Sequence, residues 1–305
     1  MIAIVGPTAS GKSDLGIAMA LRFGGEIINC DSVQVYREID IATAKVPFNM
    51  RRGVPHHLID FVPPDASYTA GDWARDAARK IEEVESRGSL AFIVGGTGFY
   101  LRALRQPLFR SPPTDERLRQ RLTAIRERHG AEHLYRILER IDPASAIKLF
   151  PRDWSRVQRA IEVRIQTRKP MLTLWKESAE GHTSAARLRI IALAPPREEI
   201  YSRINRRVEE WFGSRLLEEV QSLLSSGVPM NAKVFKALGY RHMLEHLRGK
   251  WTHEEAVDQM KIDERRYAKR QLSWFRREPG VKWIYRFGDD PKAVSEAIEL
   301  LGDMP

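Results

Sequence analysis

The chain has 305 residues, a net charge of +10 and a hydrophobic content of 43%, which fits one large domain or a core with a smaller unit. It contains no run of 18 apolar residues and no charged-then-apolar leader, so we expect neither a membrane span nor a secretory signal. The single cysteine, Cys30, excludes an internal disulfide and a multi-cysteine metal site. These features predict a soluble protein of a reducing compartment, the cytoplasm.

The positive charge is unevenly distributed along the chain. Residues 1–100 hold 10 Lys or Arg against 12 Asp or Glu, so the remaining 205 residues carry a net charge of +12. Such an excess suggests a large polyanionic partner, for example a nucleic acid. At this point a solvated basic surface explains the charge equally well.

The first motif lies at residues 6–13, where Gly-Pro-Thr-Ala-Ser-Gly-Lys-Ser fits the phosphate-binding pattern G-x-x-x-x-G-K-S. An apolar run typical of a buried strand precedes it, and apolar residues at helical spacing follow it to residue 23. The N–H groups of such a loop and of the helix start surround a di- or triphosphate, and the Ser13 hydroxyl is a candidate ligand of Mg²⁺. The residues assigned to binding of this di- or triphosphate are Gly6, Pro7, Thr8, Ala9, Ser10, Gly11, Lys12 and Ser13.

A second strand is expected at residues 26–30, and Asp31 follows it directly. An acidic residue at the carboxyl end of a strand lies where open α/β sheets bind their ligands. From its position alone, Asp31 can hold Mg²⁺ through water, accept a proton from a nucleophile, or only cap a turn. Residues 33–45 show no clear period and are interpreted as a short helix and a loop.

Three further elements follow before residue 100. A strand is expected at 55–60, where the adjacent His56 and His57 point to opposite faces and are interpreted as structural residues. An amphipathic helix is expected at 68–87, with Trp73 in its buried stripe. The apolar strand at 90–94 runs into Gly-Gly-Thr-Gly, a turn at which a ligand can approach the backbone and Thr97 offers a hydroxyl.

The character of the chain changes from Pro107 on, and residues 102–140 hold 10 arginines against 5 acidic residues. Before the next strand, expected at 188–193, only helical patterns occur, at residues 116–129, 132–141, 153–167 and 171–178. This order predicts an α/β protein with a P-loop NTPase-like parallel sheet. Its core comprises residues 1–112 and 187–305, and residues 113–186 form a helical insertion domain.

The last third of the chain is interpreted as mainly helical. One long helix is expected at 196–226, where Arg203 and Arg207 are four residues apart, so that one of them can reach bound phosphates. A turn at 236–241 precedes a helix at 254–275. Residues 261–286 hold nine Lys or Arg and three acidic residues, with aromatic residues between them. This mixture suits RNA phosphates and unpaired bases, but also a helix with a buried aromatic face.

Four stretches together resemble one family, the tRNA dimethylallyltransferases, also called tRNA isopentenyltransferases. They are the P-loop, D-S-V-Q-V-Y at 31–36 with I-A-T-A-K at 41–45, V-G-G-T-G-F-Y at 94–100, and G-Y-R at 239–241 with K-R-Q-L-S-W-F-R at 269–276. The resemblance covers essentially the whole chain, and the last three stretches make it specific. One departure is Ala42, where the family usually has glycine.

The resemblance implies that a dimethylallyl group moves from dimethylallyl diphosphate to N6 of the adenosine next to the tRNA anticodon, with release of diphosphate and with Mg²⁺ as cofactor. It also implies that Asp31 is the general base, that Thr97 lies by the base and the donor, and that Arg207 holds the diphosphate. The residues that it assigns to tRNA contact are Asp31, Ser32, Val33, Gln34, Arg119, Ser155, Arg156, Val157, Gln158, Arg159, Lys236, Gly239, Tyr240, Arg241, Lys269, Arg270 and Arg276.

The same resemblance implies that the helical insertion closes over the anticodon stem-loop and that the target adenine leaves its stack. The chain lacks the zinc-binding tail of the family's eukaryotic members, so we expect a bacterial-type enzyme. We also expect a monomer, since nothing in the sequence suggests an obligate dimer. A small-molecule kinase or NTPase, a prenyltransferase acting on free adenine nucleotides and a non-catalytic RNA-binding protein remain alternatives. The intact Lys12, Ser13, Asp31 and Thr97 argue against the last.

Overall fold

The computed structural model describes residues 1–106, 108–109, 112–179 and 188–302. Its contacts divide the chain into two compact units, one of residues 1–104 and 186–305 and one of residues 105–185. We take the second unit as the counterpart of the helical insertion expected at 113–186.

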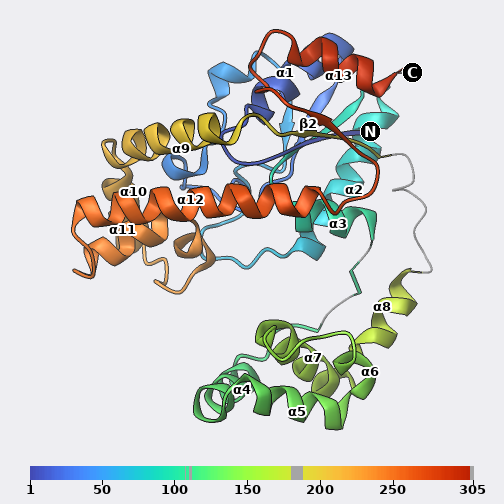
Figure 1. Cartoon of the computed structure of the whole chain (residues 1–305), viewed down its shortest axis with the longest axis vertical. Coiled ribbons are helices and arrows are strands. Elements are labelled where there is room, and N and C mark those ends of the chain that lie inside the picture. Colours follow the sequence, from blue (N-terminus) through green and yellow to red (C-terminus); the bar gives the residue numbers. More distant parts are fainter. Residues whose placement is uncertain (107, 110–111, 180–187, 303–305) are drawn as a thin grey trace. The chain divides into compact units, whose positions relative to one another are not determined.

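The first unit is built on a six-stranded, all-parallel sheet in the order β3-β2-β4-β1-β5-β6 (Figure 1). In its centre Ile4 lies between Val94 and Ile191. Residues whose side chains point to the other face of the sheet, such as Ile28 and Ile93, are also fully buried. Both faces of the sheet are therefore covered, as expected for apolar parallel strands. The strands are β1 (Ile2–Val5), β2 (Glu26–Asn29), β3 (His56–His57), β4 (Ala91–Gly95), β5 (Arg189–Leu193) and β6 (Val281–Ile284).

Helices pack on this sheet and on one another. Leu15 and Met19 of α1 share a buried cluster with Ala293 and Ala297 of α13, while Trp73 of α2 is fully buried, as expected. Helices α9 and α12 lie side by side (Figure 1). The helices of this unit are α1 (Lys12–Phe23), α2 (Ala70–Ser86), α3 (Gly98–Arg105), α9 (Arg197–Phe212), α10 (Leu216–Ser225), α11 (Tyr240–Leu247), α12 (His253–Phe275) and α13 (Ala293–Leu301), with 3₁₀ turns at Ile41–Thr43, Phe48–Arg51 and Lys233–Lys236.

The structure corrects the sequence-based elements in three places. The single helix expected at 196–226 is wrong, because the chain turns at residues 213–215 between α9 and α10, where Gly213 and Ser214 are poor helix formers. The strand expected at 55–60 is reduced to the two residues of β3. Strand β6 and helix α13 were not expected, although Val-Lys-Trp-Ile after Gly280 carries a weak strand signal.

The second unit is helical. Leu134, Leu138, Val157 and Ile161 are fully buried and belong to its own apolar core. Among the residues described here, no helix of either unit is both long and apolar enough to cross a membrane. The helices of the second unit are α4 (Glu116–His129), α5 (Ala131–Ile141), α6 (Pro143–Ala146), α7 (Trp154–Thr167) and α8 (Met171–Ala179).

Candidate active site

The P-loop connects β1 to α1 and needs glycine at two positions. Gly6 has φ +147°, and a Cβ there would lie 2.8 Å from the carbonyl oxygen of Leu193 at the end of β5. Gly11 has φ +81°, and a Cβ there would lie 2.7 Å from the amide nitrogen of Gly288. Both conformations are strained for other residues, so the motif glycines let the loop pass between two neighbouring segments.

The side chain of Lys12, at the start of α1, points back into the P-loop. Its Nζ donates a hydrogen bond of 2.6 Å to the carbonyl oxygen of Pro7, and the Ser10 hydroxyl donates one of 2.8 Å to the same oxygen. Burial lowers the pKa of Lys12 to about 8, although the nearby negative charge of Asp31 acts in the opposite direction. A desolvated ammonium of this kind gains strongly from an anionic ligand.

Asp31 forms the turn that follows β2. Its Oδ1 accepts hydrogen bonds from the amide nitrogens of Val33, at 2.8 Å, and Gln34, at 3.3 Å. Aspartate commonly stabilises turns in this way. Since both bonds involve Oδ1, Oδ2 takes no part in this turn, and a turn role and a proton-accepting role are compatible in this residue.

The glycine-rich turn after β4 packs against the Asp31 turn. The Thr97 amide donates to the carbonyl oxygen of Cys30 at 3.1 Å, and Thr97 Oγ1 accepts a hydrogen bond of 3.0 Å from the Ser32 amide. A Cβ on Gly95 would lie 2.1 Å from the Cys30 carbonyl oxygen, so only glycine permits this approach. The structure therefore brings Asp31 and Thr97 to the same edge of the sheet.

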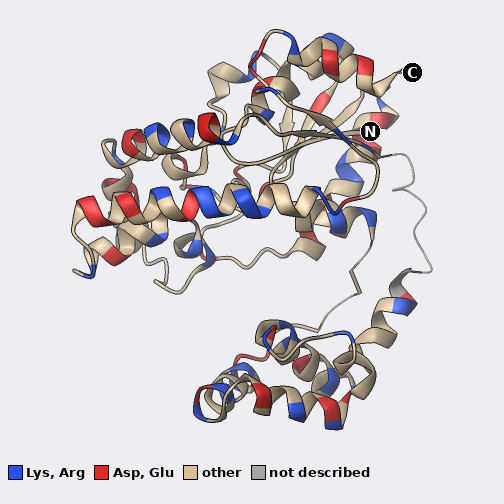
Figure 2. Ribbon diagram, viewed as in Figure 1, with Lys and Arg blue, Asp and Glu red and all other residues tan. Residues whose placement is uncertain are grey.

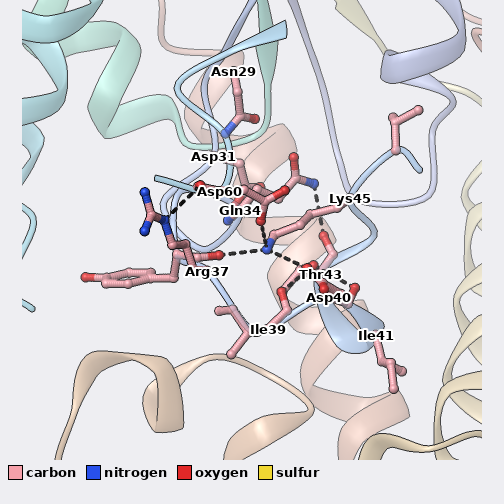
Figure 3. Close-up of polar contacts among 12 residues, drawn as sticks. Asn29, Asp31, Gln34, Arg37, Ile39, Asp40, Ile41, Thr43, Lys45 and Asp60 are labelled. Carbon is pink, nitrogen blue, oxygen red and sulfur yellow. Dashed lines mark hydrogen bonds and ion pairs between the residues drawn. The ribbon is translucent and has the colours of Figure 1, made fainter. Parts of the chain in front are cut away.

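The segment after the Asp31 turn is held by a buried lysine (Figure 3). Lys45 Nζ donates hydrogen bonds of 2.7 Å to the carbonyl oxygen of Tyr36 and to the Asp40 carboxylate, and it also pairs with Asp60. The Lys45 side chain is only 5% exposed. With all three donors of this ammonium engaged, residues 36–45 form a defined loop that contains one 3₁₀ turn.

Two contacts join this loop to other motif residues. Gln34 Nε2 donates to the carbonyl oxygen of Thr43 at 2.9 Å, which connects the two halves of the second motif (Figure 3). The methyl group of Ala42 faces Gly239, where an added Cβ would lie only 2.4 Å from the Ala42 Cβ. The residue that departs from the family pattern is therefore accommodated against a glycine.

Of the two arginines of α9 expected to reach phosphates, Arg203 and Arg207, it is Arg207 that reaches the P-loop. Its guanidinium donates to the Thr8 hydroxyl, lies 3.7 Å from the carboxylate of Glu264, and is 4.6 Å from the ring centroid of Trp211. Burial lowers the pKa of Arg207, while the Glu264 charge opposes this shift. Arg203 instead pairs with Asp289 at 2.9 Å.

Helix α12 contributes three residues that the sequence analysis did not assign. Gln271 forms hydrogen bonds with Thr8 and with Gly96. Glu264 is only 5% exposed, and burial raises its pKa. Burial also raises the pKa of Tyr267. A signal for Glu264 was present, because it occupies a core position in the helix between Met260 and Ala268. An acidic residue in an apolar stripe is costly unless it has a partner or a function.

The basic residues proposed for RNA contact in the first unit differ in their surroundings. The Arg241 guanidinium forms an ion pair with Asp263. Gly239 is buried. Figure 2 shows the positive charges along α12. The proposed cations Lys236, Lys269, Arg270 and Arg276 are exposed, and so is Arg241.

In the second unit the predicted RNA segment lies at the start of α7. Ser155 and Arg156 are exposed. Arg119 Nε and Arg159 Nη1 contact the two carboxylate oxygens of Glu162 at 2.8 and 2.9 Å, and the Glu162 side chain is fully buried. The two arginines are thus oriented by a buried carboxylate and stay partly exposed.

Three residues expected to contact tRNA have buried side chains. Val157 and Tyr240 are fully buried, and Gln158 is 5% exposed. The Gln158 amide donates to the carbonyl oxygen of Arg119 at 3.1 Å, and the Tyr240 hydroxyl bonds to Glu219. The structure gives these side chains a packing role, contrary to the expectation of direct contact with tRNA.

The parallel sheet, the P-loop and the polar groups at the carboxyl ends of the strands define a P-loop-type enzyme. Family models agree, since the one described as IPP transferase matches residues 34–278 and the one described as isopentenyl transferase matches residues 1–51. The chain belongs to the IPP transferase family.

Individual relatives give the same result. Proteins named tRNA dimethylallyltransferase from Koribacter versatilis and Solibacter usitatus are 47% and 44% identical to this chain, covering 99% and 98% of it and 97% of each relative. The crystal structure of tRNA isopentenylpyrophosphate transferase from Bacillus halodurans matches with 38% identity and a TM-score of 0.71, over 97% of this chain and 93% of that one.

A solved eukaryotic dimethylallyltransferase acting on tRNA matches with 30% identity and a TM-score of 0.72, over 90% of this chain and 69% of that one. Together these similarities confirm the predicted family, the P-loop NTPase-like fold and the class of enzyme, a transferase.

Proposed function

We propose that this chain transfers a dimethylallyl group from dimethylallyl diphosphate to N6 of the adenosine next to the anticodon of a tRNA, releasing diphosphate. One observation carries this proposal. The partly buried cations Lys12 and Arg207 meet at the P-loop, and the loops of Asp31 and Thr97 end at the same sheet edge. Anion-binding groups thus lie beside a proton acceptor, as prenyl transfer to an amine requires.

The chemistry follows from this arrangement. The N6 nitrogen attacks the first carbon of the dimethylallyl group, a C–N bond forms, and the C–O bond to diphosphate breaks. The leaving diphosphate takes the electron pair and is stabilised by Lys12, Arg207 and the N–H groups of the loop. The surplus N6 proton passes to the Asp31 carboxylate. Thr97 positions the acceptor base through its place next to the Asp31 turn.

Mg²⁺ fits the residues at the P-loop. Ser13 lies at the first turn of α1, and Asp31 is close enough to Lys12 to influence its pKa. Among the described residues, no three His, Cys, Asp or Glu side chains form a protein-only metal site. Mg²⁺ is commonly held by few protein oxygens, phosphates and water, so Ser13 would ligate it and the ion would neutralise diphosphate charge.

The RNA-binding part of the proposal concerns exposed and partly exposed residues of both units. Basic residues meet phosphates, and the target adenine leaves its stack to reach the pocket. We further propose that the second unit binds the anticodon stem-loop and that the enzyme acts as a cytoplasmic monomer. The residues proposed for tRNA contact are Asp31, Ser32, Val33, Gln34, Arg119, Ser155, Arg156, Arg159, Lys236, Arg241, Lys269, Arg270 and Arg276.

Calorimetry and mass analysis test this proposal. Dimethylallyl diphosphate and inorganic diphosphate should bind in a Mg²⁺-dependent manner, and ATP should compete poorly. An anticodon stem-loop incubated with enzyme and donor should gain the mass of one dimethylallyl group, whereas a stem-loop with guanosine at the target position should not. Tighter binding of ATP, with release of ADP and unchanged RNA, would instead establish a kinase.

A further inference from the structure

We infer that Gln271 is a positioning residue that couples the P-loop to the Thr97 loop and thereby fixes the prenyl donor relative to the acceptor amine. The assignment of donor and acceptor sides rests on the proposed function. The coupling itself rests on the contacts of one buried side chain.

The Gln271 amide uses both of its ends. Its Oε1 accepts a hydrogen bond of 2.7 Å from the Thr8 amide, and its Nε2 donates one of 2.9 Å to the carbonyl oxygen of Gly96. The side chain is 5% exposed. A reversed amide would place NH₂ against N–H and oxygen against oxygen, so these partners determine a single orientation.

The two partners lie directly next to residues of the proposed mechanism. The Thr8 hydroxyl accepts a hydrogen bond from the Arg207 guanidinium. The hydrogen bond between the Thr8 amide and Gln271 therefore holds the part of the P-loop that Arg207 contacts. Gly96 precedes Thr97, whose Oγ1 binds the Ser32 amide. One path from the diphosphate side to the acceptor side therefore passes through the side-chain amide of Gln271.

The approach at Gly96 shows how closely this bridge fits. A Cβ on Gly96 would lie 2.1 Å from Gln271 Nε2, a distance at which one of the two groups must move. The same helix carries the exposed Lys269 and Arg270, which we propose to meet RNA phosphates. Helix α12 thus links the proposed RNA surface with the spacing of the two loops.

Two variants separate the two ends of the bridge. Gln271→Met removes both hydrogen bonds at similar side-chain length. Gln271→Glu keeps an acceptor for Thr8 but sets a carboxylate oxygen against the Gly96 carbonyl. Because small displacements of reacting groups are costly, we expect kcat to fall about 10²-fold in both variants, with less than about a threefold change in KM for dimethylallyl diphosphate. The matched control is Gln221→Glu, the same change at an exposed position of α10, which should leave both constants unchanged.

A second measurement does not depend on prenyl transfer. Inorganic diphosphate should slow amide hydrogen exchange in the P-loop peptide and also in residues 94–101 of the wild-type protein. In Gln271→Met only the P-loop peptide should be protected. Undiminished protection of residues 94–101 in that variant, or a wild-type kcat in either folded variant, would overturn the inference. So would a rise in KM with unchanged kcat, which indicates a role in binding alone.

The outcomes for the proposed function and for Gln271 remain distinguishable. If the wild-type protein transfers no prenyl group to RNA, the proposed function fails, and the exchange experiment still decides whether Gln271 couples the loops. If Gln271→Met does not fold, Gln271→Glu takes its place in both measurements.

Discussion

The guanidinium of Arg207 lies 3.7 Å from the carboxylate of Glu264, and both side chains are largely buried beside the P-loop. Within the part of the chain that the structure describes, neither Arg207 Nε nor Glu264 Oε2 has a hydrogen-bond partner. Buried polar atoms rarely remain unpaired in folded proteins. This pair therefore has unused polar capacity next to the site proposed for diphosphate.

Opposite effects on diphosphate affinity are expected from the two partners. Arg207→Gln removes a charge-assisted contact and should weaken binding of inorganic diphosphate by about 10- to 100-fold. Glu264→Gln removes a negative charge beside Arg207 at the proposed diphosphate site and should strengthen binding by roughly fivefold. Calorimetry measures both, with the exposed neighbour Arg206→Gln as control. Weaker binding in Glu264→Gln would mean that the carboxylate is needed to orient Arg207.

Asp31→Asn keeps the hydrogen bonds of the turn, because an amide oxygen can replace Oδ1 as acceptor. The variant loses the proton acceptor, so kcat should fall by about 10²–10⁴ while tRNA affinity changes little. Single-turnover rates and filter binding test the two parts. Near-normal turnover would remove Asp31 from the general-base role, and strongly weakened tRNA binding would assign it to recognition.

Three exposed cations in the last turns of α12 and directly after it should determine how RNA affinity depends on salt. Neutralising Lys269, Arg270 and Arg276 together should flatten the log–log slope of tRNA affinity against salt by about two to three, without changing which base is modified. A control triple variant neutralises Arg79, Arg206 and Lys250, which are exposed elsewhere on the first unit. Equal slopes in the wild type and in the variant of Lys269, Arg270 and Arg276 would show that these charges are only solvated and do not contact RNA phosphates.

Gly239→Ala should destabilise the first unit. Gly239 has φ +86°, and its new Cβ would lie 2.4 Å from the Ala42 Cβ. Backbone strain of roughly 1–2 kcal/mol adds to the cost of this overlap. In the double variant with Ala42→Gly the overlap is removed and only the backbone strain remains. Its free energy of unfolding, measured by chemical denaturation, should therefore lie between those of Gly239→Ala and the wild type. Full recovery, or none, would contradict this division of the cost.

Acid should weaken the second unit through Glu162. Burial alone would raise the pKa of Glu162, but hydrogen bonds from Arg119 and Arg159 outweigh it and hold the pKa below the ordinary value of 4.5. A lowered pKa means that the ionised pair stabilises the fold above about pH 4.5 and that this contribution is lost as the pH falls through the lower value.

Glu162→Gln should therefore lower the stability of the full chain at pH 7 by about 3 kcal/mol, since it leaves two arginines without their buried partner. The difference from the wild type should shrink below about pH 4.5, where the wild type also loses the charge. Thermal unfolding of both proteins across this range tests the prediction. A difference that stays constant with pH would show that the Glu162 charge does not contribute.

The sequence by itself determined the features that depend on local chemistry. Glycines that permit unusual backbone angles, a lysine and a serine at a helix start, and polar residues after apolar strands specify the P-loop, Asp31 and Thr97 within short segments. The order of strand and helix patterns likewise predicted the parallel sheet and a separate helical unit. Such signals can be read from the sequence because each is formed by residues that are adjacent in the chain.

Only the tertiary structure decided which distant elements complete the site. Helical spacing indicates that Arg203 and Arg207 share a face, but the packing of α9 decides that Arg207 reaches Thr8 while Arg203 pairs with Asp289. The same holds for Gln271, whose partners are 263 and 175 residues away in the chain. Periodicity defines the face of a helix, whereas the neighbour that covers this face follows from how all the elements pack together.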